Sequence, residues 1–213
     1  AVKLPQLLSR PGAHIDLARY WLRHHEPVRA LASLREAAQH LTPETAPLLT
    51  SFRATALEMA GDISSARELY ELLTHSKDTK IRFHALICLA GLIGRSGNLD
   101  KASELLDKAL TDPNPWRKRL ARLLKGRYAQ RMGQNEQALA ELDLALWPTW
   151  REFGPCLALR AEALDLLGRK DESVRTYLLA LVECSTYDSW PLAGEPAAVS
   201  PLFVPEFLTI RRS

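Results

Sequence analysis

The sequence predicts an all-α fold made of five stacked helix pairs, and the prediction is based on three periodic columns of small residues. The first column is glycine at Gly61, Gly97, Gly133 and Gly168, spaced 36, 36 and 35 residues apart, with His25 one period upstream. The second column, five residues further on, comprises Ala30, Ala66, Ala102, Ala138 and Ser173. The third comprises Ala18, Ala54, Ala90, Gly126 and Ala161. A fixed period of about 20–50 residues indicates a solenoid of stacked supersecondary units.

Each period indicates two helices joined by a tight turn. Glycine of the first column allows positive φ after the first helix, and prolines at 41–45, 111–115 and 147–150 separate one pair from the next. No strand-like alternation of useful length precedes residue 185. The predicted pairs are 12–24 with 27–40, 44–60 with 62–75, 79–95 with 98–110, 115–132 with 134–146, and 152–167 with 170–184.

The composition is that of a soluble globular protein, with 46% hydrophobic and 25% charged residues among 213. The net charge of +3 does not by itself indicate nucleic acid or an anionic membrane as a partner. Cys88, Cys156 and Cys184 lie in apolar helical patterns, so we expect buried thiols and a reducing compartment. The cytoplasm is therefore favoured, and the periplasm stays open. Because no apolar run reaches about 18 residues, no membrane-spanning helix is expected, and the first residues lack the apolar region of a signal peptide.

The fourth period resembles the tetratricopeptide repeat (TPR) family. In that family a small residue is followed twelve positions later by alanine, then by an aromatic residue or leucine, a second alanine and a proline. The matching residues here are Gly126, Ala138, Leu142, Ala145 and Pro148. The resemblance covers about residues 11–184. It implies a right-handed superhelix of antiparallel helix pairs whose concave face is lined by the first helix of each pair.

Three features depart from the family pattern. The period is 36 rather than about 34 residues. Basic residues stand where the family usually has leucine in three periods, at Arg53, Lys125 and Arg160. The family's two-carboxylate clamp needs Lys and Asn at set places on successive first helices, but Asn98, Asn114 and Asn135 are all in predicted turns, so the clamp is absent. We therefore do not expect a co-chaperone of the Hsp70 or Hsp90 type.

The resemblance also defines a candidate binding groove. An arrangement of apolar residues beside arginines suits an extended or helical peptide with apolar anchors and acidic flanks. The alternative is that these side chains pack against neighbouring helices or a tail and bind no ligand. The groove residues would be Ile15, Arg19, Leu22, Arg23, Leu48, Thr55, Glu58, His84, Ile87, Arg95, Leu120, Leu123, Arg127 and Arg131.

No catalytic, cofactor or metal site is expected from the sequence. His24 and His25 are adjacent and so point to different faces of a helix, which is poor metal geometry. There is no glycine-rich phosphate loop and no Ser/His/Asp or Cys/His arrangement with a recognisable local signature. The basic stretch 116–127 favours an amphipathic helix with a solvated basic face over an RNA contact. Trp116, Trp147 and Trp150 are expected to fill the junctions between pairs, with interface anchors as the alternative.

The domain prediction is an N-terminal segment over 1–11, a TPR-like array over 12–184 and a C-terminal capping segment or linker over 185–213. The last segment contains four prolines together with many large apolar residues, and a solenoid needs its last apolar face covered. We therefore expect it to fold back as a cap. Docking into the protein's own groove or onto a second copy, and a linker role, are the alternatives.

The functional expectation is a protein–protein interaction scaffold or adaptor, not an enzyme. Its partner would be a protein or peptide with apolar and acidic residues. Two alternatives remain open, a regulatory or substrate-recruiting module of a larger enzyme or transcription regulator, and a secretion or assembly chaperone. The sequence leaves the oligomeric state undecided.

Overall fold

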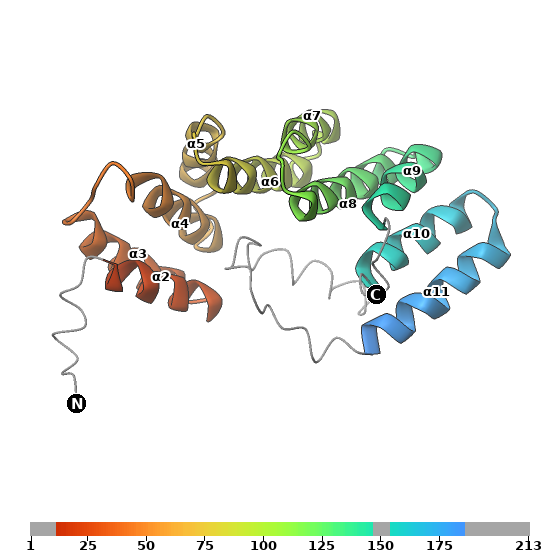
Figure 1. Cartoon of the computed structure of the whole chain (residues 1–213), viewed down its shortest axis with the longest axis horizontal. Coiled ribbons are helices and arrows are strands. Elements are labelled where there is room, and N and C mark those ends of the chain that lie inside the picture. Colours follow the sequence, from red (N-terminus) through yellow and green to blue (C-terminus); the bar gives the residue numbers. More distant parts are fainter. Residues whose placement is uncertain (1–11, 147–153, 186–213) are drawn as a thin grey trace. The chain divides into compact units, whose positions relative to one another are not determined.

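The computed structural model describes residues 12–146 and 154–185, and every regular element in these ranges is an α-helix. This confirms the all-α prediction, and each helix bound lies within two residues of the predicted one. Ten helices in the described part form five consecutive pairs (Figure 1). The pairs are α2 (Ala13–Arg23) with α3 (Pro27–Ala38), α4 (Ala46–Met59) with α5 (Ile63–Leu73), α6 (Thr79–Arg95) with α7 (Leu99–Ala109), α8 (Pro115–Arg131) with α9 (Asn135–Leu146), and α10 (Gly154–Leu166) with α11 (Lys170–Ser185).

The described chain divides into two compact units, and the division falls within α6. Residues 12–89 belong to the first unit, and the described residues from Ala90 to Ser185 belong to the second. The predicted segment 1–11, the junction tryptophans Trp147 and Trp150, and the predicted cap after Ser185 lie outside the described residues.

The turn inside each pair has the backbone conformation that the glycine column predicts. Gly61, Gly97, Gly133 and Gly168 have φ of 88°, 93°, 76° and 76°, and His25 takes the same left-handed region with φ of 56°. Glycine adopts this region without strain because it has no Cβ. The His25 backbone therefore shows that the turn is built in the first pair as well, without a glycine.

Side-chain caps fix where several helices begin. Asp62 accepts a hydrogen bond from the Ser65 amide at the start of α5, and Asn98 accepts one from the Lys101 amide at the start of α7. Asn114 accepts hydrogen bonds from the first two amides of α8. Such caps satisfy amides that have no partner inside the helix. Asn98 and Asn114 thus serve the fold.

The two other small-residue columns lie where the helices of a pair approach closely. The alanines of both columns are fully buried, and Gly126 and Ser173 are buried too. A Cβ on Gly126 would stand 2.8 Å from Cγ of Leu142 and 3.2 Å from the Ala138 carbonyl, so the α8–α9 contact leaves no space for a side chain there. Ser173 replaces alanine at no cost in hydrogen bonding, because its hydroxyl donates to the Ala161 carbonyl at 2.8 Å.

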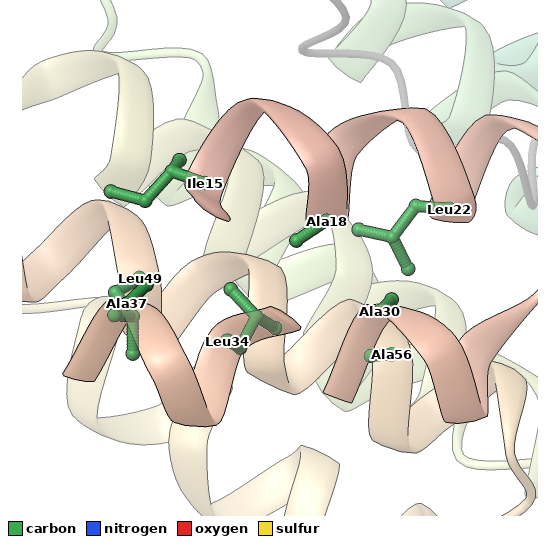
Figure 2. Close-up of a cluster of buried hydrophobic side chains, with 8 residues drawn as sticks. All are labelled: Ile15, Ala18, Leu22, Ala30, Leu34, Ala37, Leu49 and Ala56. Carbon is green, nitrogen blue, oxygen red and sulfur yellow. The ribbon is translucent and has the colours of Figure 1, made fainter. Parts of the chain in front are cut away.

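Alternating alanine and leucine fill the core of the first unit. Figure 2 shows Ile15, Ala18 and Leu22 of α2 beside Ala30, Leu34 and Ala37 of α3, together with Leu49 and Ala56 of α4. Leu48 and Phe52 pack against this cluster while remaining partly exposed. Since small and large residues alternate on facing helices, the helices interlock at close range.

Candidate partner-binding surface

The apolar residues predicted for the groove belong mainly to the core. Ile15 and Leu22 are part of the cluster in Figure 2, and only 2% of Ile87 and 1% of Leu123 are accessible to solvent. Ile15 and Leu22 lie on the stripe of α2 that faces the cluster shared with α3 and α4. These four side chains therefore pack within the fold and are not part of an accessible surface.

The buried Thr55 and Glu58 and the half-buried His84 meet in a polar network of the first unit. The Tyr70 hydroxyl donates to Glu58 Oε2 at 2.9 Å and lies 3.3 Å from Thr55 Oγ1. The Tyr70 ring meets the His84 imidazole edge-on, with centroids 6.1 Å apart. The network links α4, α5 and α6, so these three predicted site residues hold the first unit together.

The two ring nitrogens of His84 have partners on different helices. Ser51 Oγ lies 3.1 Å from His84 Nδ1, and Cys88 Sγ lies 3.5 Å from Nε2. Burial lowers the pKa of His84 to about 4, so the ring is neutral at neutral pH. Sequence patterns did not reveal this Ser–His–Cys contact, because Ser51 and His84 are 33 residues apart on the first helices of successive pairs.

In the first unit, the arginines of α2 lie at the surface. Arg19 is half-buried, 3.7 Å from the Asp16 carboxylate and 5.7 Å from the centre of the Phe52 ring. Arg23 is exposed in the last turn of α2. Both remain predicted partner contacts.

Helix α8 carries seven basic residues and no acidic residue. Part of this charge is matched by acidic residues of α7 and α9. Lys125 Nζ lies 2.5 Å from Asp107 and 3.2 Å from Glu141, and Arg122 donates to Glu141 at 2.8 Å. Burial lowers the pKa of Lys125, but its hydrogen bonds to Asp107 and Glu141 outweigh that effect, so the pKa is raised and the ammonium stays charged.

This pairing accounts for two departures from the TPR pattern. Lys125 and Arg160 replace the usual leucine, and each meets an aspartate on the second helix of the preceding pair. Lys125 pairs with Asp107, and Arg160 Nε donates to Asp143 at 2.6 Å. In the second unit, an ion pair thus joins the first helix of a pair to the second helix of the preceding pair. Arg53, the remaining departure, is exposed.

The rest of the α8 surface includes one accessible side with both apolar and basic residues. Trp116, Leu120, Arg127 and Arg131 are spaced by four, seven and four residues, so they lie on one side of the helix; we call them the α8 stripe. Trp116 is 43% exposed, Leu120 and Arg127 are partly exposed, and Arg131 is exposed. The sequence identified Leu120 and the two arginines, whereas Trp116 was expected to fill a junction. Its exposure favours the interface alternative.

Arg95 lies near the end of this stripe. Arg131 donates through Nη1 to the Gly94 carbonyl at 3.4 Å, which brings the ends of α6 and α8 together next to Arg95. The Arg95 side chain folds back along α6, with Nη1 3.7 Å from where a Cβ on Gly91 would stand. The Tyr128 hydroxyl makes a second contact between α8 and α6 by donating to the Ala90 carbonyl at 3.2 Å. Arg131 therefore bonds to the residue that precedes Arg95, and Arg127 lies one turn before Arg131 on α8.

No protein-family model and no curated protein matches the sequence. Solved structures do match. The chain resembles a putative kinesin light chain from Podosopora anserina with nearly identical TPR-like repeats, at 18% identity and a TM-score of 0.63 over 85% of this chain and 100% of the other. The chain has a TPR-like fold.

MamA structures share this fold. MamA from Desulfovibrio magneticus RS-1 is 16% identical, with a TM-score of 0.64 over 85% of this chain and 98% of that one. Another MamA crystal structure is 15% identical, with a TM-score of 0.62 over 87% and 98%. At these identities the likeness establishes the TPR-like fold and leaves the partner to be inferred from the surface.

Two further observations apply to the described part of the chain. No three or more His, Cys, Asp or Glu side chains gather there in a way that could hold a metal ion. None of the helices described is both long enough and apolar enough to span a membrane.

Proposed function

We propose that this chain is a protein-interaction scaffold, and that the α8 stripe with Arg95 binds a partner segment containing apolar and acidic residues. The observation that carries the proposal is the composition of α8. The helix has seven basic residues and no acidic residue, and its accessible side combines arginine with Trp116 and Leu120.

The chemistry of the stripe suits a peptide or a protein surface. Guanidinium groups bind carboxylates through paired, charge-assisted hydrogen bonds, and a partly exposed tryptophan offers a large apolar contact. Arg127 and Arg131 lie one helical turn apart, so two carboxylates with similar spacing on the partner can meet both of them. The TPR-like fold supports the proposal because it presents such first helices in series.

Peptide selection tests the proposal without assuming a partner. A random peptide library is panned on the full chain, and the selected peptides are measured by fluorescence anisotropy against the wild type and the Arg127→Glu and Arg131→Glu variants. We expect enriched peptides to combine acidic with apolar residues. Each reversal should weaken binding about tenfold or more, or about 1.4 kcal/mol, and higher salt should weaken wild-type binding.

Lys118→Glu is the matched control. Lys118 is on the same helix as the stripe. Because it is two residues after Trp116, it lies on nearly the opposite side of the helix. Lys118→Glu makes the same change of charge as the arginine reversals. Because Lys118 lies off the α8 stripe, the variant should leave peptide affinity largely unchanged. Peptides without acidic residues, or an equal loss in the Lys118 variant, would show that binding depends on net charge or on another surface.

A further inference from the structure

Helix α11 presents an apolar side that nothing in the described residues covers. Val174, Tyr177, Leu178 and Leu181 are spaced by three, one and three residues and lie within one side of the helix. They are 58%, 41%, 58% and 62% exposed. Ser173, Thr176 and Ala180 on the adjoining side are buried, and Ser173 bonds to α10. We call the four exposed residues the α11 stripe.

Of the four positions in the stripe, that of Tyr177 is buried in every earlier pair and that of Val174 is buried in the fourth pair. Tyr177 occupies the column of Leu34, Tyr70, Leu106 and Leu142, whose exposed fractions are 3%, 0%, 0% and 0%. Val174 occupies the position of Leu139, which is 8% exposed. Apolar area left in water at the end of an array costs stability and invites association. We therefore expect another element to cover the α11 stripe.

One substitution indicates what kind of element covers it. At the position of Leu178 the two preceding second helices have Asp107 and Asp143, which pair with Lys125 and Arg160 of the following first helix. Leu178 cannot form such a pair. The element that covers α11 must therefore place an apolar group there instead of a basic one.

Residues 202–210 meet this requirement. They contain Leu202, Phe203, Val204, Phe207, Leu208 and Ile210, and neither lysine nor arginine. Helix α11 is about 24 Å long, and the sixteen residues from 186 to 201 can span up to about 50 Å. The segment can therefore return along the helix, and because it is on the same chain its effective concentration is high.

We propose that residues 202–210 bind the α11 stripe of their own chain and cover it. Hydrogen–deuterium exchange on the full chain tests this. Amides in 202–210 should exchange at least about tenfold more slowly than in an unstructured peptide. Leu178→Ser with Leu181→Ser should abolish that protection, and Phe203→Ser with Phe207→Ser should speed exchange in α11.

Leu179→Ser is the matched control. Leu179 is 56% exposed, almost as much as Leu178. Because it is the next residue along the helix, it lies on a different side of α11. It should leave the protection of 202–210 intact. Unchanged exchange in α4 and α5 would show that each variant is folded.

Other outcomes overturn the proposal. Absence of protection in 202–210, or protection that survives the Leu178/Leu181 change, would place the segment elsewhere. Protection that grows with protein concentration, together with a dimer in light scattering, would identify a second copy as the occupant. None of these results depends on peptide binding by the α8 stripe, so the two proposals can fail separately.

Discussion

One backbone conformation repeats at the turn of every helix pair, and His25 is the residue that adopts it with a side chain. Four glycines and His25 take positive φ at this position. For a residue with a side chain, this region costs about 1–2 kcal/mol in conformational free energy because its Cβ approaches the following carbonyl. A Cβ on Gly133 would meet nothing within 4 Å, so the effect of a substitution there is conformational and not a clash.

Exchanging the two residue types between turns should therefore change stability in opposite directions. Gly133→His should lower the free energy of unfolding by about 1–2 kcal/mol. His25→Gly should raise it by less, about 0.5–1 kcal/mol, because glycine also gains entropy in the unfolded chain. Urea denaturation followed by circular dichroism measures both. Equal losses in the two variants would mean that His25 makes a stabilising contact that outweighs its strain.

At the scale of elements, the polar network around His84 joins α4, α5 and α6 and makes their association pH-dependent. An unfolded histidine titrates near 6.5, whereas burial lowers the pKa of His84 to about 4. Between these values the unfolded chain binds more protons than the folded one. The contribution of a neutral His84 is thus complete above about pH 6.5 and is lost as the pH falls toward 4.

Replacing His84 should remove this dependence. The free energy of unfolding of the wild type should fall from pH 6.5 to 4 more steeply than that of His84→Gln, whose amide can still reach Ser51. Denaturant midpoints measured across this range give both slopes. The exposed His75, changed to Gln, shows how far a histidine substitution alone alters the slope. Parallel slopes for wild type and His84→Gln would contradict a buried neutral ring.

The sequence predicted the elements well because each relies on local chemistry that recurs. Glycine after the first helix, alanine at the close approach and proline between pairs each specify one position, and the structure has the helices there. The surface was harder to predict. The helical spacing of Ile87 and Leu123 is the same whether the side chains face a groove or the core. Whether they are exposed or buried depends on how the helices pack, and the structure shows them buried.

Long-range contacts were beyond the sequence. Ser51 of α4 contacts His84 of α6 in the next pair, and Lys125 of α8 pairs with Asp107 of α7. Neither contact leaves a motif along the chain, because the partners are 33 and 18 residues apart and the helices between them set their separation. The fold class, by contrast, required only the period.

At the scale of the whole molecule, the helices make their contacts with their own pair and with neighbouring pairs. Helix α3 contacts α2 and α4 in the first unit, and α9 contacts α8 and α10 in the second. In repeat arrays stability is the sum of such near-neighbour terms, so a local change is felt most by adjacent repeats. Ala30 and Ala138 are fully buried at the same position of the repeat, one in each unit, and therefore make a matched pair of sites.

Ala30→Leu and Ala138→Leu should each overpack one pair and destabilise it by about 1–3 kcal/mol. Hydrogen–deuterium exchange should then speed up in α2–α5 for the first variant and in α8–α11 for the second, while the other set keeps its wild-type rates. This expectation follows because each unit has its own buried core and the added methyl groups strain only the helices that touch them. Faster exchange in both sets for either variant would mean that the two units unfold as one cooperative body, and no change in either would place the two alanines away from a close helix contact.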